Sequence, residues 1–220
     1  MSKKLAIVHT TPVTVEPLKA LAAQYLPDFN VINFVDDSIL PQLGQSGGKL
    51  EEVQDRFLQY HAFAEEAGAD VILSACSSVG ELVALAQEKV SVPVVRIDEA
   101  MAEEAINRGE KIGVVATLST TLNPTLKLLE EKAAAANKEV QLEPKLADEA
   151  YKCLLNGDKE GHDRILAEIL GEMGKRLQVI VLAQASMARV LDSLPEDERG
   201  KYLTSPQLGM VRVKQIAEGI

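Results

Sequence analysis

VILSACSSVGE, residues 71–81, is the stretch that decides the fold of this chain. It begins with the continuous apolar run Val71–Leu73, which is typical of a strand buried on both faces of a parallel sheet. Small polar residues follow, and Ser78 with Glu81 forms the S-x-x-E pattern of a helix amino terminus. The stretch therefore predicts a strand, a tight turn and a helix, the connection that α/β proteins repeat along the chain.

The same alternation continues on both sides of this stretch. Short apolar runs predict strands, and longer runs with apolar residues at helical spacing predict helices between them. The expected strands are 5–9, 31–35, 71–74, 92–97, 111–116, 140–142 and 179–182, and the expected helices are 13–25, 50–67, 81–87, 101–107, 124–136, 148–155 and 163–177. Residues 36–49, with Pro41 and three glycines, are predicted to form a loop. This order of elements predicts an α/β protein with doubly wound parallel sheets.

Segments of the second half repeat the pattern of the first. The offsets are 106 from Leu5 to Lys111, 108 from Val71–Cys76 to Val179–Gln184, and 113 from Pro93 to Pro206. They predict two similar halves, residues 1–108 and 109–220, with the C-terminal segment as a candidate for crossing back to the first half. Because open α/β sheets bind ligands at the carboxyl ends of their strands, we expect the site in a cleft between the halves.

Composition excludes several classes of protein. The 220 residues, 46% of them apolar, are sufficient for a sizeable core. A net charge of −10 argues against nucleic acid as a partner, since phosphate binding needs a basic face. No apolar run approaches the ~20 residues of a membrane span, and the N-terminal residues lack the pattern of a signal peptide. We therefore expect a cytoplasmic protein with no membrane partner.

The sequence gives no reason to expect a metal or a cofactor. Its two cysteines and three histidines are far apart and have no metal-ligand spacing. Neither of the glycine-rich nucleotide-binding motifs, G-x-x-x-x-G-K-[ST] and G-x-G-x-x-G, occurs. Cys153 falls within a helical pattern and is interpreted as a packing residue, whereas His162 is expected to be solvated.

Cys76 is the strongest candidate for a reactive residue. It lies just before a predicted helix, where free N–H groups and the helix dipole favour a thiolate. The same N–H groups, together with the hydroxyls of Ser77 and Ser78, are suited to hold a substrate carboxylate. A small cysteine that fills a strand end is the alternative, and the cluster of hydroxyls around Cys76 favours the functional interpretation.

A second polar turn follows the first predicted strand. Thr10 and Thr11 provide hydroxyls that could bind an anion, and His9 could carry a proton near neutral pH. The alternative is a polar turn closed by Pro12, with a buried and hydrogen-bonded His9.

Equivalent turns occur in the second half. Thr117 and Thr120 follow one strand, and Gln184 and Ser186 follow another. Gln184 occupies the position that Cys76 holds in the first half, but an amide cannot carry a proton at physiological pH. These hydroxyls could bind a carboxylate, or they could simply cap the helices that follow.

Taken together, these turns resemble those of the aspartate/glutamate/hydantoin racemase superfamily. The resemblance covers nearly the whole chain and is carried by residues 7–12, 71–80, 93–104, 113–121 and 179–188. It implies two similar halves and an active site in which a cysteine from each half flanks the acidic carbon of the substrate. One cysteine removes a proton and the other delivers one to the opposite face. Cys76-Ser77-Ser78 corresponds to the first cysteine motif, whereas Gln184 stands at the second cysteine position.

The resemblance implies a cofactor-independent, racemase-like isomerase that acts on a small carboxylic acid through an enediolate. Cys76 would be the acid/base, with Gln184 and, more weakly, His9 as further catalytic candidates. The carboxylate-binding candidates are Thr10, Thr11, Ser77, Ser78, Thr117, Thr120 and Ser186. Because Gln184 replaces a cysteine, two alternatives stay open: a one-cysteine lyase such as a decarboxylase, and a small-acid-binding protein without turnover. A homodimer is expected.

Overall fold

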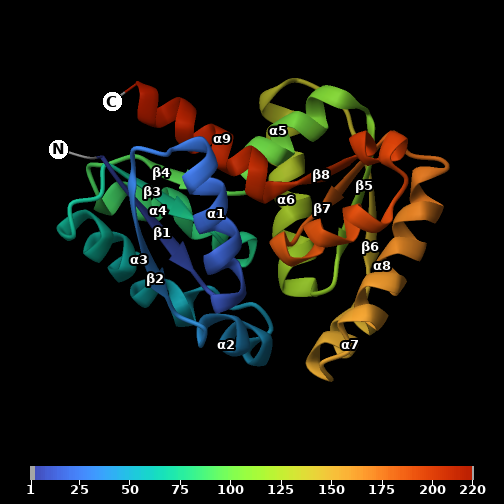
Figure 1. The fold of residues 1–220 in the computed structure, drawn as a ribbon, viewed down its shortest axis with the longest axis horizontal. Coiled ribbons are helices and arrows are strands. Elements are labelled where there is room, and N and C mark those ends of the chain that lie inside the picture. Colours follow the sequence, from blue (N-terminus) through green and yellow to red (C-terminus); the bar gives the residue numbers. More distant parts are fainter. Residues whose placement is uncertain (1–2, 220) are drawn as a thin grey trace. The chain divides into compact units, whose positions relative to one another are not determined.

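The computed structural model describes residues 3–219, and within that range each half of the chain is built around its own parallel sheet (Figure 1). The first sheet contains β1 (Lys4–His9), β2 (Asn30–Val35), β3 (Val71–Ser74) and β4 (Val94–Arg96), in the order β2-β1-β3-β4. The second contains β5 (Lys111–Ala116), β6 (Gln141–Leu146), β7 (Val179–Leu182) and β8 (Tyr202–Thr204), in the order β6-β5-β7-β8. The predicted α/β fold with parallel sheets is confirmed.

Helices lie between the strands along the chain. The α-helices of the described range are α1 (Val15–Tyr25), α2 (Ile39–Ser46), α3 (Glu51–Glu66), α4 (Val83–Lys89), α5 (Glu99–Arg108), α6 (Ser119–Ala135), α7 (Asp148–Leu155), α8 (Lys159–Gly174) and α9 (Ser205–Glu218). Shorter 3-10 helices are η1 (Pro12–Thr14), η2 (Ser77–Leu82), η3 (Ala185–Ser193) and η4 (Glu196–Lys201). Among residues 3–219, no helix has the combination of length and apolarity needed to cross a membrane.

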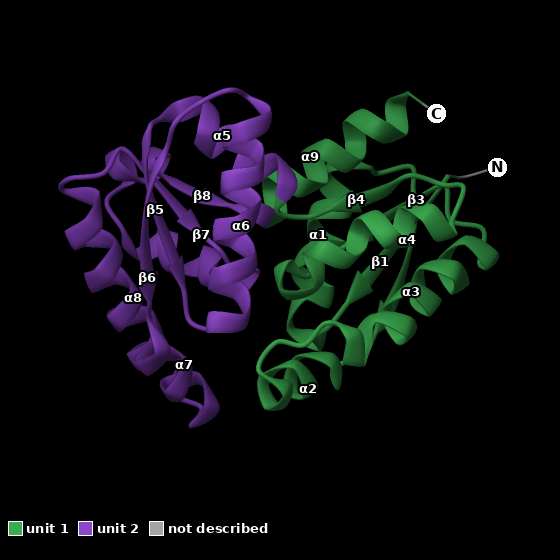
Figure 2. Ribbon diagram, turned by 180° about the vertical axis from the view of Figure 1, so that it is seen from behind, with its two compact units in different colours: residues 1–98, 206–220 green, residues 99–205 purple. Residues whose placement is uncertain are grey.

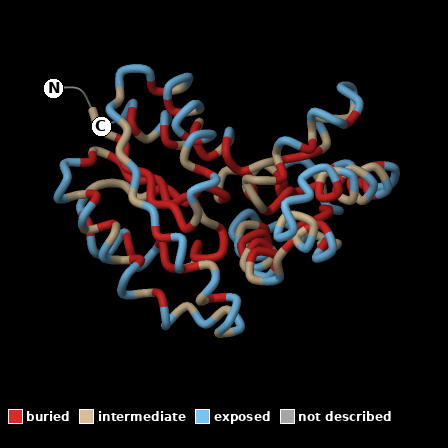
Figure 3. The backbone as a smooth tube through the Cα atoms, turned by 60° about the horizontal axis from the view of Figure 1, so that its bottom comes forward, coloured by how far each residue is buried: buried red, intermediate tan, exposed pale blue. Residues whose placement is uncertain are grey.

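Each sheet is buried on both faces, which explains the continuous apolar runs of its strands. In the first unit, one face packs against α2, α3 and α4, and the other against α1 and α9. In the second unit, α7, α8 and η3 cover one face, whereas α5 and α6 pack against β7 and β5. Figure 3 shows the buried backbone concentrated in the strands, with exposed residues on the outer helical faces.

The two sheets repeat one another in strand order and in register. Leu5 pairs with Val71 in the first sheet, and Ile112 pairs with Val179 in the second. Leu5 therefore corresponds to Ile112, one residue beyond the expected Lys111. The repeat itself is confirmed, since both sheets place the first strand of the half between the second and third.

The expected match between Pro93 and Pro206 is wrong. Val94 pairs with Ile72, and Tyr202 pairs with Ile180, so Pro93 corresponds to Lys201. The two prolines have different structural roles: Pro93 precedes a strand, whereas Pro206 lies in the first turn of α9, where a missing N–H is tolerated.

The two units exchange their last helices. The chain divides into residues 1–98 with 206–220, and residues 99–205 (Figure 2). The division falls at Asp98, not at the expected residue 108, because α5 packs with α6 in the second unit. In return, α9 follows the last strand of the second unit and packs in the first, where Met210 and Val213 are fully buried.

Residues 36–49, expected to form a loop, contain helix α2. Ile39 and Leu43 lie four residues apart and are buried in the first core. Pro41 falls in the first turn, where no N–H is required, and Gly47 ends the helix with a φ of 69°. The proline and glycines thus mark the two ends of a short helix, and burial of its apolar face stabilises it.

Candidate functional site

Cys76 lies at the carboxyl end of β3 and begins η2. Its backbone is extended, with φ −146° and ψ 117°, and its side chain is half-buried. The N–H of Ala75 donates to the carbonyl of Val8 at 2.9 Å, which continues the β1·β3 pairing beyond Ser74. By this register Thr10 is the neighbour of Cys76 on the same face of the sheet.

Burial controls the protonation of Cys76. Removal from solvent raises the pKa of the thiol and is the largest effect. The Thr10 hydroxyl, the N–H groups of Ser78 and Val79 and the Ser78 hydroxyl act in the opposite direction, but the pKa stays above its ordinary value. The expectation that the start of a helix would favour the thiolate is therefore wrong in its net effect.

Hydroxyl groups surround the sulfur on this face. Ser77 and Ser78 are buried, as the Cys76 turn folds them inward. Thr10 Oγ1 and Ser74 Oγ are also buried, and neither makes a hydrogen bond to a nitrogen or oxygen atom within residues 3–219. Buried hydroxyls normally have such partners, so the two atoms are suited to meet a polar ligand or water. Sequence reasoning missed Ser74, although a spacing of two along a strand places it on the same face as Cys76.

His9 points to the opposite face of the sheet. Successive side chains of a strand alternate between faces, so His9 and Thr10 diverge. Nδ1 of the fully buried imidazole lies 2.8 Å from Thr14 Oγ1, and Nε2 lies 2.9 Å from Asn33 Oδ1. Burial lowers the pKa of His9 despite the opposing hydrogen bond from Asn33. This geometry fits the structural alternative, a neutral imidazole that fixes the turn.

Thr11 is half-exposed and acts as a helix cap. Its Oγ1 accepts a hydrogen bond from the N–H of Val13 at 3.4 Å, and its carbonyl accepts one from the Thr14 hydroxyl. The structure thus brings Thr10, but not His9 or the capping Thr11 hydroxyl, into the immediate surroundings of Cys76.

The second unit contains an equivalent pair. Ala183 N–H donates to the carbonyl of Val115 at 2.9 Å, so Thr117 is the neighbour of Gln184, as Thr10 is of Cys76. The N–H and hydroxyl of Thr117 donate to Gln184 Oε1 at 2.6 and 2.8 Å. This fixes the carboxamide through its oxygen and leaves its N–H₂ group to donate to a ligand.

The other candidates of the second unit are less enclosed. Thr120 is half-exposed in the first turn of α6, which begins at Ser119 and not at the expected residue 124. Ser186 is half-exposed in η3. Buried Thr121, which the sequence did not single out, lies in the same turn as Thr120.

His162 and the two arginines nearest the strand ends, Arg189 and Arg96, are paired with carboxylates. His162, expected to be solvated, is fully buried, with Nδ1 2.6 Å from Asp163 Oδ1. Arg189 pairs with the same carboxylate at 2.9 Å. Arg96, at the end of β4, donates from Nε to Asp98 Oδ1 at 2.6 Å in a buried pair. The sequence offered a signal for this last pair, since both charges lie two residues apart at a strand end.

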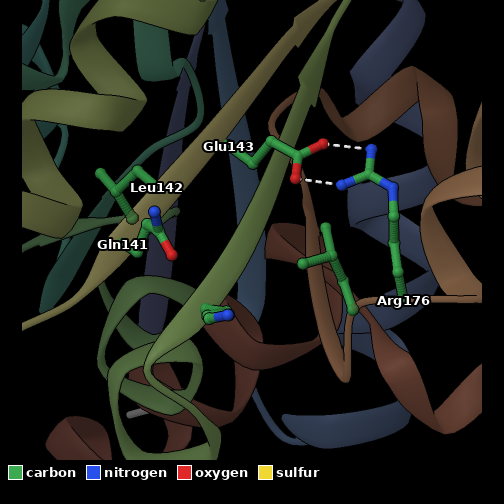
Figure 4. A pocket seen from close by; sticks show the side chains of 6 residues that line it. Gln141, Leu142, Glu143 and Arg176 are labelled. Atoms are coloured by element: carbon green, nitrogen blue, oxygen red, sulfur yellow. Dashed lines mark hydrogen bonds and ion pairs between the residues drawn. The ribbon is translucent and has the colours of Figure 1, made fainter.

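Two hollows of the surface lie away from these strand ends. One of about 290 Å³ is lined by Lys111 and Gln141, the first residues of β5 and β6, and by the Glu143–Arg176 ion pair (Figure 4). Another of about 520 Å³ is lined by Lys3, Phe29 and residues of α9. Both are at the amino ends of strands, whereas open α/β sheets bind ligands at the carboxyl ends.

Comparison with known proteins gives a consistent result. Residues 8–210 match the family model described as Asp/Glu/Hydantoin racemase. The fold is similar to glutamate racemase from Bacillus anthracis (TM-score 0.74, 18% identity, 99% of this chain and 82% of that one). It is also similar to glutamate racemase from Francisella tularensis in complex with D-glutamate (0.72, 18%, 99% and 82%) and to allantoin racemase from Klebsiella pneumoniae (0.73, 18%, 100% and 89%). No curated protein matches the sequence.

Proposed function

Because the chain belongs to the Asp/Glu/hydantoin racemase family, we propose that it is a cofactor-independent, racemase-like isomerase of a small carboxylic acid. The observation that carries this proposal is the position of Cys76, at a strand end among N–H groups and buried hydroxyls, two of which have no nitrogen or oxygen partner among residues 3–219. Membership of the racemase family supports an isomerisation. The hydroxyl and N–H donors of the turn at Cys76 support a carboxylate as the group that is bound.

Cys76 is the proposed acid/base. In the thiolate form, its sulfur takes the proton from the carbon next to the substrate carboxylate. The C–H bond breaks, an S–H bond forms, and the electron pair moves into the carboxylate to give an enediolate. Water on the opposite face of the carbon then donates a proton, because the Gln184 amide carries none, and the acid is restored with inverted configuration. The Cys76 thiol gives its proton to the hydroxide that remains, which regenerates water and the thiolate. Hydroxyl and N–H donors at the strand ends stabilise the charge that develops on the two oxygens.

Each unit has its own candidates for binding a carboxylate, at the carboxyl ends of its strands. In the first unit they are the hydroxyls of Thr10, Ser77 and Ser78, with Ser74 added because its buried oxygen has no partner among the described residues. In the second unit they are Thr117 and the N–H₂ group of Gln184. Thr11, Thr120 and Ser186 are the more exposed members of the proposed set.

A lyase, such as a decarboxylase, is the second candidate, and two observations favour it. Gln184 cannot deliver a proton from a second face, and burial raises the pKa of the Cys76 thiol, which favours its protonated form. A protonated thiol is the form needed to protonate an enediolate from one side after CO₂ leaves. The pair of reactions therefore differs in which form of Cys76 begins the cycle.

Proton exchange in D₂O tests the proposal. A panel of small carboxylic acids would be incubated with the wild-type protein, with Cys76→Ala and with Cys153→Ala as the matched control. Deuterium at the α-carbon with inversion, lost only in Cys76→Ala, is the result expected of the isomerase. Release of CO₂, with one deuterium added to one face of the product carbon, would contradict the isomerase and support the lyase. Tight binding of an acid without exchange or CO₂ release would contradict both and leave a binding protein.

A further inference from the structure

A buried ion pair lies against the turn that follows Cys76. Arg96, the last residue of β4, donates from Nε and Nη2 to both carboxylate oxygens of Asp98, at 2.6 and 3.2 Å. The side chains are 10% and 0% exposed. Burying two charges carries a desolvation cost that often offsets their attraction, so such a pair is weak evidence of a role in stability alone.

The guanidinium group packs directly on the backbone of Gly80, which lies in η2. A Cβ atom at Gly80 would lie 2.4 Å from Cζ and Nε of Arg96 and 2.6 Å from Nη2. Only glycine leaves room for this contact. Arg96 also pairs with Ser74 across β3 and β4, so its side chain leaves the sheet on the face that carries Cys76.

The η2 turn, which the Arg96–Gly80 contact holds, supplies N–H donors to the Cys76 sulfur. The N–H groups of Ser78 and Val79, directly before Gly80, both act on the Cys76 thiol. A shift of Gly80 would move these two donors, because they share one 3-10 turn with it.

The second unit shows that the fold itself does not need the pair. By the register of the two sheets, Thr204 corresponds to Arg96 and Pro206 to Asp98. Counting from Gln184 as the equivalent of Cys76, Ala188 corresponds to Gly80. The half that lacks the cysteine thus also lacks the arginine, its carboxylate and the glycine.

We propose that Arg96, oriented by Asp98 and seated on Gly80, is a positioning residue that holds the Ser78 and Val79 N–H groups against the Cys76 sulfur. This inference rests on the proposed role of Cys76 as the acid/base. Since Asp98 balances the charge of Arg96, the effect is carried by the geometry of the turn.

Two substitutions disturb the contact from opposite sides. Arg96→Lys removes the planar group and its two-pronged bond to Asp98, whereas Gly80→Ala inserts a methyl group and leaves both charges in place. The pH dependence of iodoacetamide labelling at Cys76 would be followed by mass spectrometry, with Cys153 as the reference thiol in the same molecule. Arg176→Lys, which alters the exposed pair with Glu143, is the matched control.

Both variants are expected to shift the labelling profile of Cys76 to higher pH and to slow labelling at neutral pH by about three- to tenfold, because a site loosened by less than 1 Å loses its donors. The double variant should label no more slowly than the slower single one, since both changes break the same contact. Cys153 and the Arg176→Lys control should behave as in the wild type. If Arg96→Lys does not fold, as judged by circular dichroism, Gly80→Ala decides the question.

An unchanged Cys76 profile in a folded Gly80→Ala variant would overturn the positioning role. The labelling needs no substrate, so the experiment can contradict the positioning role of Arg96 without bearing on the proposed function. If the profile shifts while Cys76→Ala still turns over substrate at the wild-type rate, the contact stands and the acid/base role of Cys76 falls.

Discussion

At the scale of single residues, the protonation of Cys76 separates the two candidate reactions. Burial raises the pKa of the Cys76 thiol and so disfavours the thiolate. An isomerase that begins with the thiolate should gain kcat/KM by about tenfold per pH unit until the pKa of the thiol is passed. A lyase that uses the thiol as the acid should instead be level near neutral pH and lose activity at alkaline pH. A pH profile that is the same in Cys76→Ser as in the wild type would contradict both.

Gln184 gives the second prediction at this scale. Gln184→Cys places a proton carrier at the position that corresponds to Cys76, and we expect it to gain or increase α-proton exchange with inversion for acids that fit the site. The gain is expected to be small, because a donor must lie within about 0.5 Å of its productive position. Exchange in D₂O would measure it.

Gln184→Ala is the matched control for that experiment. It also releases Thr117 from Gln184 Oε1, but it provides no group that carries a proton. If Gln184→Ala gains as much exchange as Gln184→Cys, the change comes from altered binding and the argument from a missing proton carrier is wrong. Efficient inversion by the wild type would show that another residue already supplies the second proton.

At the scale of elements, helix α2 offers a paired test of its glycines. A methyl group would meet no atom within 4 Å at Gly44 or at Gly47, but Gly47 has a φ of 69°. Gly44→Ala should raise the free energy of unfolding by about 0.5–1 kcal/mol, since alanine is the better residue within a helix. Gly47→Ala should lower it by about 1 kcal/mol, because an L side chain is strained in the left-handed region. Urea unfolding of both variants checks the opposite signs; equal signs would show that α2 is not formed.

At the scale of the whole molecule, the exchange of helices makes the first unit depend on both ends of the chain. Helix α9 packs closely on the segment after β4: a Cβ atom at Gly209 would lie 2.6 Å from the carbonyl oxygen of Ile97. Gly209→Ala is therefore expected to destabilise the protein by about 1–3 kcal/mol through overpacking. Gly171→Ala, at a position inside α8 with no atom within 4 Å, is the control and should raise the free energy of unfolding by about 0.5–1 kcal/mol, as at Gly44. Thermal unfolding of the two variants would decide, and a neutral Gly209→Ala would contradict the packing of α9.

The expected homodimer also belongs to this scale. A symmetric dimer is the commonest assembly of enzymes of this size, and it stays a prediction for this chain. Light scattering on the purified protein would give a mass near twice the 23.8 kDa of one chain if it is right. A mass of one chain over the concentrations used for activity would contradict it.

Local sequence patterns were enough to predict the order of elements and the paired positions of the site. Apolar runs such as Val71–Leu73 are local features, and a strand buried on both faces needs them wherever it lies. Cys76 and Gln184 could be matched because each lies five residues after the first residue of such a run, Val71 or Val179. A local pattern sufficed for these conclusions because it records the periodicity and burial of its own segment.

Which side chains meet depends on how the elements pack together. The register of β1 on β3 places Thr10, and not His9, beside Cys76, and the depth of the turn raises a pKa that local sequence indicated would fall. The pairing of Arg96 with Gly80, like the crossing of α9 to the first unit, joins residues that are separated along the chain. Contacts of this kind depend on how elements pack, and that packing is set by the burial of all apolar faces at once, which no single stretch of sequence contains.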